Sequence, residues 1–148
     1  MSKPTFLLVD GHSLLHSWAE LRRLHRDHPR HARNELAARL ARYADASGER
    51  VVIVFDGQGE TSEEPRRIPG LQVFYSGSGK TADDVIERLV VKYADRYELT
   101  VATEDLAERT TVEASGAWTT GTAGLVERVH RAEAGLAEKI KRLRGGNR

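Results

Sequence analysis

Short continuous runs of apolar residues alternate along this chain with longer stretches in which apolar residues recur at helical spacing. The continuous runs predict strands at residues 5–10 (TFLLVD), 51–56 (VVIVFD), 71–75 (LQVFY) and 99–103 (LTVAT). Strands without polar alternation are typical of a parallel sheet that is covered on both faces. We therefore predict an α/β fold with three layers, in which a central, mainly parallel sheet is flanked by helices.

The stretches with helical spacing carry their apolar residues on one face. They predict helices around residues 14–21, 32–43, 81–94, 105–113 and 125–143. Pro29 separates the first two, and Gly48 is the expected C-terminal stop of the second. The segment 57–70 is polar and contains Gly and Pro, so it is expected to be a loop, and Trp118 is expected near another loop.

The chain has 148 residues and no cysteine. This length suits one domain over residues 1–148, with a basic tail from about residue 141. The lack of cysteine excludes disulfides and thiolate metal sites, which fits a reducing cytoplasm. The apolar run at 6–9 is too short for a signal peptide, and no run approaches the roughly 18 to 20 residues of a membrane span. We expect a soluble cytoplasmic protein without a membrane partner.

The net charge is only +1, but two segments are strongly basic, residues 22–33 and 139–148. Local basic patches can hold phosphates on a protein without a large overall charge. Arg22, Arg23 and Arg26 are therefore candidates for contacts with a nucleic-acid backbone. The alternative is that both segments are solvated helix faces and a frayed tail.

The string GSGKT at residues 77–81 resembles the end of a phosphate-binding loop. The full pattern needs a glycine five positions before Gly79, and that position is Phe74. A nucleotide hydrolase is thus a minor alternative. Lys80 remains a candidate for holding a phosphate, although a solvated loop lysine has the same appearance.

Aspartates follow three of the predicted strands, at Asp10, Asp56 and Asp105. The carboxyl ends of parallel strands meet at one edge of a sheet, where ligands bind. Asp83 and Asp84 begin the helix at 81–94 and are expected at the same edge. Clustered carboxylates repel one another unless a cation neutralises them. Oxygen ligands select Mg²⁺ or Mn²⁺, which can activate water for attack on a phosphodiester.

The same acids have a simpler interpretation as helix caps. Thr81 and Asp84 have the spacing of a capping box, and acids in the first turn suit the helix dipole. Strand-end aspartates can likewise cap the helices that follow them. The sequence leaves both interpretations open.

Five segments of the chain carry a resemblance to a known family, in the same order. They are LLVDGHSLLHSWAELR, VVIVFD, KTADDVIERL, VATEDLAER and GAWTTGTAGLVERV. Together they resemble the YacP-like NYN-domain proteins of bacteria, which belong to the PIN-like nuclease superfamily. The likeness spans residues 6 to about 143.

The resemblance implies a PIN-like fold and metal-dependent endoribonuclease activity, and we expect the substrate to be single-stranded RNA. Well-described members look like ribosome-associated enzymes that cut mRNA during translation. By matching positions, Asp10, Asp83 and Asp105 would be catalytic metal ligands for Mg²⁺ or Mn²⁺. Asp56 and Asp84 would support the metal.

The turn after the first strand departs from the family pattern. Ser13 replaces the family's Asn, and His12 replaces its Tyr. Ser13 can still orient Asp10, His12 can contact a phosphate, and Thr103 can hydrogen-bond a water on the metal. The turn DGHS also resembles 5′-nuclease domains attached to bacterial DNA polymerases, which leaves open whether the substrate is RNA or DNA. The alternative function is a catalytically silent module that binds RNA or the ribosome.

Overall fold

The fold is built around one parallel sheet, seen in a computed structural model that describes residues 3–57 and 70–145. Its strands are β1 (Thr5–Asp10), β2 (Arg50–Phe55), β3 (Leu71–Tyr75), β4 (Glu98–Ala102) and β5 (Trp118–Thr120). They lie in the order β3-β2-β1-β4-β5, and all four neighbouring pairs are parallel. The predicted α/β fold with a parallel sheet between helices is confirmed.

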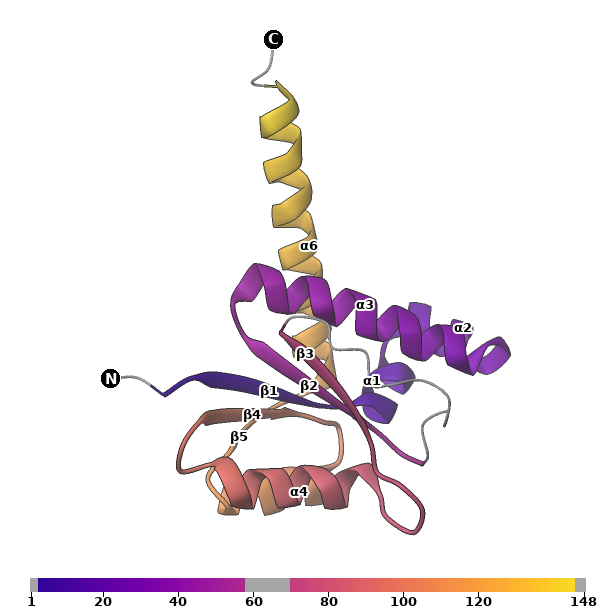
Figure 1. The fold of residues 1–148 in the computed structure, drawn as a ribbon. Coiled ribbons are helices and arrows are strands. Elements are labelled where there is room, and N and C mark those ends of the chain that lie inside the picture. Colours follow the sequence, from indigo (N-terminus) through magenta and orange to yellow (C-terminus); the bar gives the residue numbers. More distant parts are fainter. Residues whose placement is uncertain (1–2, 58–69, 146–148) are drawn as a thin grey trace.

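Helices cover both faces of the sheet (Figure 1). They are α1 (Gly11–Ser17), α2 (Ala19–Asp27), α3 (Pro29–Ser47), α4 (Ala82–Tyr93), α5 (Leu106–Ala114) and α6 (Thr122–Gly145). The first three pack on one face together with the first half of α6, and α4 and α5 pack on the other. No helix among these described residues is long and apolar enough to cross a membrane.

Alternate side chains of the central strands point into two separate hydrophobic cores, one on each face of the sheet. Leu7 and Val9 of β1 point into the core beneath α1, α3 and α6, whereas Leu8 between them points into the core beneath α4. This alternation is the period of a strand. It explains why β1 is apolar at every central position.

The predicted elements agree with the structure to within about one residue for the four long strands and for α4 and α5, as is usual for element boundaries. Gly48 ends α3 in the left-handed conformation with φ of 77°, as its type predicts. Two features were missed: the short strand β5 contains Trp118, and an extended Trp18 separates α1 from α2. Most of the predicted loop 57–70 lies outside the described residues.

Candidate metal centre

The carboxyl ends of β1, β2 and β4 lie side by side because the strands are parallel and in register. Asp10 is the last residue of β1, Asp56 follows β2, and Thr103 follows β4. The helix α4 begins at the same edge, since the backbone N–H of its first residue, Ala82, donates to Asp56 Oδ1 at 2.6 Å. The edge of the sheet thus collects side chains from several segments.

Three carboxylates converge at this edge. Asp10, Asp83 and Glu108 each offer an oxygen, and these oxygens all lie within 4.8 Å of one another. They come from β1, α4 and α5. Asp10 and Glu108 are buried and Asp83 is half-buried. This trio, the acid cluster, is the one group among the described residues in which three such side chains lie close enough to share a metal ion.

Glu108 carries the strongest electrostatic perturbation of the cluster. Its side chain is 2% exposed, and this burial, together with hydrogen bonding to Asp83 and the nearby charges, raises its pKa to about 9. Thr103 opposes the shift, because its hydroxyl donates to Glu108 Oε2 at 2.9 Å. Without a cation, Glu108 therefore keeps its proton at neutral pH.

Asp10 is perturbed in the same direction. Burial raises its pKa, and the charges of Asp83 and Asp56 add to the effect. The backbone N–H of Ser13 donates to Asp10 Oδ1 at 3.2 Å and acts in the opposite sense, as does a hydrogen bond from the Ser13 side chain. Ser13 therefore still supports Asp10, although it replaces the residue expected from the resemblance.

The donor set fits a hard divalent cation. All three side chains offer carboxylate oxygens, which are the ligands of Mg²⁺ and Mn²⁺. Glu108 Oε1 is buried and no donor reaches it; the group beside it is the Asp83 carboxylate, which it can contact favourably only while Glu108 carries its proton. Once ionised, this buried oxygen has no partner, which is costly. A cation at this point would satisfy Oε1 and offset the repulsion between the carboxylates.

Asp105, predicted as a ligand, lies outside this group of three. Its Oδ1 accepts hydrogen bonds from the backbone N–H groups of Ala107 at 2.9 Å and Glu108 at 3.2 Å. It is the N-cap of α5. Asp105 thereby fixes the first turn of the helix that carries Glu108.

The predicted supporting acids also cap a helix start. Asp84 and Thr81 form the capping box of α4, with both reciprocal hydrogen bonds present. Asp56 accepts from the first N–H group of α4. The interpretation of these residues as caps therefore describes what their side chains do, and together they position Asp83.

Sequence reasoning missed Glu108. Its signal was present in the segment TEDLAE, because an acid three residues after the N-cap Asp105 lies one turn into the helix. Acids in the first turn of a helix are common simply because they interact favourably with the helix dipole, so their presence does not indicate a metal ligand. Only the tertiary placement of α5 against α4, with Glu108 facing the carboxyl end of β1, shows that this acid is buried beside Asp10.

Three further residues lie at this edge of the sheet: Gly11 and His12, which begin α1 directly after Asp10, and Thr103, which follows β4. Gly11 has no room for a side chain, since a Cβ there would lie 2.4 Å from the Phe55 ring. His12 is exposed, and its Nε2 lies 3.0 Å from Nε2 of His16. Thr103 is fully buried and orients Glu108 rather than pointing into solvent.

Lys80 lies on an exposed turn that leads into α4. The buried Ser76 anchors this turn, because its hydroxyl donates to the carbonyl of Lys80 at 2.8 Å and accepts from the N–H of Gly57 at 2.9 Å. Phe74, where a phosphate-binding loop needs its first glycine, is part of β3. The turn is therefore a strand-to-helix connection beside the acid cluster.

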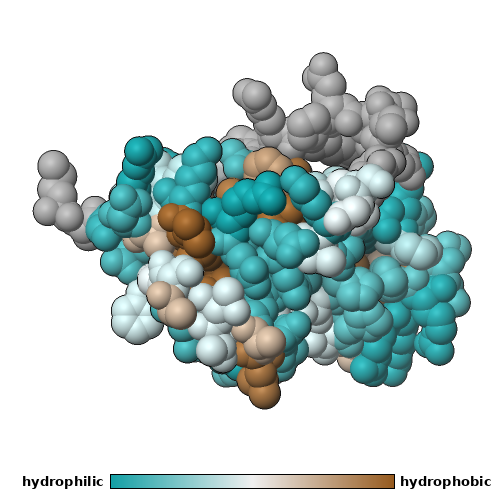
Figure 2. Space-filling model, turned by 90° about the horizontal axis from the view of Figure 1, so that it is seen from below, coloured by the Kyte–Doolittle hydropathy of each residue, from teal (hydrophilic) through white to brown (hydrophobic). Residues whose placement is uncertain are grey.

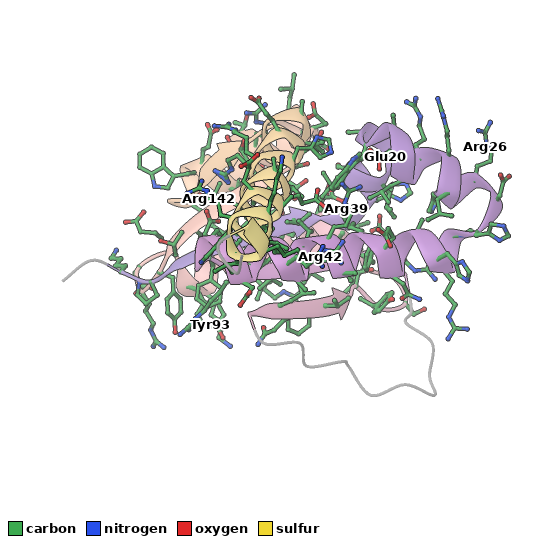
Figure 3. All side chains as sticks on the ribbon, turned by 90° about the horizontal axis from the view of Figure 1, so that it is seen from above. Glu20, Arg26, Arg39, Arg42, Tyr93 and Arg142 are labelled. Carbon is green, nitrogen blue, oxygen red and sulfur yellow. The ribbon has the colours of Figure 1, made fainter. Side chains whose placement is uncertain are left out.

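The predicted basic residues Arg22, Arg23 and Arg26 are exposed on α2. In Figure 3, Arg26 points outward at the far end of α2. Arg39 behaves differently, because its guanidinium forms ion pairs with Glu20 at 2.9 Å and Glu133 at 2.7 Å. Arg39 therefore ties α3 to α2 and α6, while the arginines of α2 are left facing solvent.

Comparison with known proteins gives a consistent result. Residues 7–148 match the model of the YacP-like NYN domain family. A Bacillus subtilis (strain 168) protein, the uncharacterized protein YacP, is 27% identical over 139 residues, which are 93% of this chain and 82% of that protein. The crystal structure of Rae1 (YacP) from Bacillus subtilis superposes with a TM-score of 0.83 and is 26% identical, and the match covers 95% of this chain and 82% of that chain. The structure of a mutant form of that protein superposes with a TM-score of 0.80 and is 27% identical, and the match covers 93% of this chain and 82% of that chain.

Proposed function

Because this chain belongs to the YacP-like NYN domain family, which is a PIN-like nuclease family, we propose that it is a metal-dependent endoribonuclease. Its reaction is the hydrolysis of phosphodiester bonds in single-stranded RNA. The observation that carries the proposal is the acid cluster of Asp10, Asp83 and Glu108 with its unpartnered buried oxygen. A binding module has no need for three converging carboxylates, two of which, Asp10 and Glu108, have a raised pKa.

The acid cluster would hold Mg²⁺ or Mn²⁺. When bound, such an ion supplies a water of lowered pKa and positive charge for the phosphate. Glu108 must release its proton to become a ligand, and Thr103 holds its carboxyl in place at 2.9 Å. Ser13 holds Asp10 in the same way through its N–H group.

We assign Glu108, rather than Asp105, as the third ligand. Asp105 acts on the metal through Glu108, because it fixes the N-terminus of α5. Asp56 and Asp84 act through Asp83, because they fix the N-terminus of α4. These three aspartates are positioning residues in this proposal.

The substrate is held by exposed bases on two sides. Lys80 lies beside α4 at the edge that carries the acid cluster, and Arg22, Arg23 and Arg26 lie along α2. Contacts of this kind go to phosphates and carry no sequence information. His12, exposed at the start of α1, is a further contact at the edge. The resemblance to ribosome-associated enzymes extends the proposal to mRNA that is cut on the ribosome in the cytoplasm.

The alternative, a silent module that binds RNA or the ribosome, rests on Ser13 in place of the family's Asn. Ser13 donates to Asp10 from its backbone N–H, and its side chain also lowers the pKa of Asp10. Because Asp10 keeps hydrogen bonds from this residue, the replacement by Ser does not count against the enzyme.

The test is cleavage of an end-labelled single-stranded RNA with Mn²⁺ or Mg²⁺. Wild type should cut, and EDTA should stop it. Asp83→Asn and Glu108→Gln should each lower the rate by more than the roughly 10- to 100-fold that loss of an outer-shell partner typically costs. Asp95→Asn, an exposed aspartate beyond α4, is the matched control and should cut normally. If free RNA stays intact, the assay is repeated with translating ribosomes. If metal-dependent cleavage is seen neither with free RNA nor with translating ribosomes, the proposal is contradicted.

A further inference from the structure

A groove crosses the α4 side of the sheet, away from the acid cluster, between β3 and the second half of α4. Its volume is about 240 Å³. Its floor is apolar and buried, with Leu8 at 3%, Val52 at 5% and Leu99 at 3% exposed. Figure 2 looks onto this face, where brown and pale side chains lie among the teal ones. The groove thus combines an apolar, buried floor with a side that is open to solvent.

The walls of the groove are aromatic. Phe6, Tyr97 and Tyr93 form one wall, with ring centroids 4.9 Å apart for Phe6 and Tyr97 and 5.8 Å apart for Tyr93 and Tyr97. Phe74 of β3 also lines the groove and is 43% exposed. A flat ring that entered the groove would meet aromatic faces and edges.

Two cations flank the aromatic wall. The Arg50 guanidinium lies 5.5 Å from the centroid of Phe6, and Lys92 Nζ lies 5.3 Å from the centroid of Tyr93. Both residues are exposed, so each charge can also contact an anion in solvent. Aromatic platforms with neighbouring cations are how proteins hold single-stranded nucleic acids, by stacking on bases and attracting phosphates.

We infer that this groove binds one base of a single-stranded RNA, with Arg50 and Lys92 on the adjoining phosphates. The identity of the nucleic acid rests on the proposed function. The volume lies below the roughly 300 Å³ at which pockets for drug-sized ligands begin, so it suits a single flat ring. An aromatic side chain of a protein would use the walls but leave both cations without a counter-charge.

The groove and the acid cluster share one helix. Asp83 lies in the first turn of α4, and Leu89 and Tyr93 of the same helix line the groove. At about 1.5 Å per residue, the groove begins about 9 to 15 Å along the helix from Asp83. A single strand that crosses the cluster can therefore place a base in the groove a few nucleotides from the cut. In Figure 3, Tyr93 and Arg26 lie on opposite sides of the molecule, so the groove is distinct from the arginines of α2.

The test is photo-crosslinking of the wild-type chain to an oligouridylate that contains 4-thiouridine, in EDTA, with the crosslinked peptides mapped by mass spectrometry. The result expected is a crosslink to Phe74, Tyr93 or Tyr97. Crosslinks confined to α2, α3 or α6 would overturn the inference. Since no cleavage is needed, loss of the proposed nuclease function leaves this result intact, and the reverse also holds.

Variants give a second, quantitative measure of the same binding. Phe74→Ala should weaken the affinity for the oligouridylate about 5- to 100-fold, the usual effect of losing one stacked base. Val91→Ala is the control, because Val91 is 71% exposed and lines a different hollow between α4 and α5. Lys92→Gln should lower the salt dependence of binding more than Arg88→Gln, whose arginine lines that other hollow. Equal affinities for Phe74→Ala and Val91→Ala would contradict the inference.

Discussion

Replacing Glu108 by Gln should make the metal-free protein more stable at neutral and alkaline pH. The folded state raises the pKa of Glu108 to about 9, whereas an unfolded Glu titrates near about 4.3. Between these values the folded chain holds a proton that the unfolded chain has released. Stability of the wild type is therefore lost as the pH rises through this window.

The size of the effect follows from that one proton. Each pH unit within the window removes about 1.4 kcal/mol from the free energy of unfolding. From about pH 6 to about pH 8 the wild type should thus lose roughly 3 kcal/mol relative to Glu108→Gln. Gln suits the site because its amide oxygen can accept from Thr103, as Glu108 Oε2 does at 2.9 Å, and its NH₂ can donate to Asp83.

The assay is urea unfolding of both proteins in EDTA at several pH values. The difference between them cancels other titrating groups, such as His25, whose pKa is lowered by burial and by neighbouring histidines. Saturating Mn²⁺ should remove the wild-type slope, because the cation displaces the proton. Parallel stability curves for the two proteins in EDTA would refute the protonated Glu108.

Three further predictions use other contacts. Asp105→Ala should cost about 1 kcal/mol of stability because it removes the cap of α5, and it should weaken Mn²⁺ binding measured by calorimetry. Asp105→Asn keeps the cap and should retain the stability and the Mn²⁺ affinity of the wild type. Gly11→Ala should lower the stability by about 1 to 3 kcal/mol in thermal unfolding, because the new Cβ would collide with Phe55. Gly135→Ala is the control: this glycine lies in open space on α6, so the change should raise the stability by up to about 1 kcal/mol. Binding of a uridine oligonucleotide should weaken with salt, and Arg22→Gln with Arg26→Gln should flatten that dependence in fluorescence titrations; an unchanged slope would exclude α2 from the RNA interface.

The sheet could be predicted from the sequence because its strands are strongly patterned. β1 and β2 are continuous apolar runs, and each is followed or ended by an aspartate. The strand β5 has only three residues, two of them Thr, which is too short for a periodic signal. The break at Trp18 has neither Pro nor Gly beside it, so nothing in the local sequence indicates where α1 ends.

The acid cluster could be predicted only in part. Asp10 and Asp83 follow from a strand end and a helix start that topology brings to one edge. Asp105 was the natural third candidate by the same reasoning, but its oxygen is already used by two N–H groups of α5. Glu108 takes the place beside Asp10 because one turn of α5 points it inward. Such a choice between neighbouring acids is decided by side-chain direction, which spacing alone does not contain.

The most direct test of the metal centre is anomalous diffraction from crystals of the chain grown with Mn²⁺. We predict a single strong peak bounded by Asp10, Asp83 and Glu108, and its loss in crystals of Glu108→Gln. A peak at Asp105 away from Glu108, or no peak at the acid cluster at saturating Mn²⁺, would contradict the account.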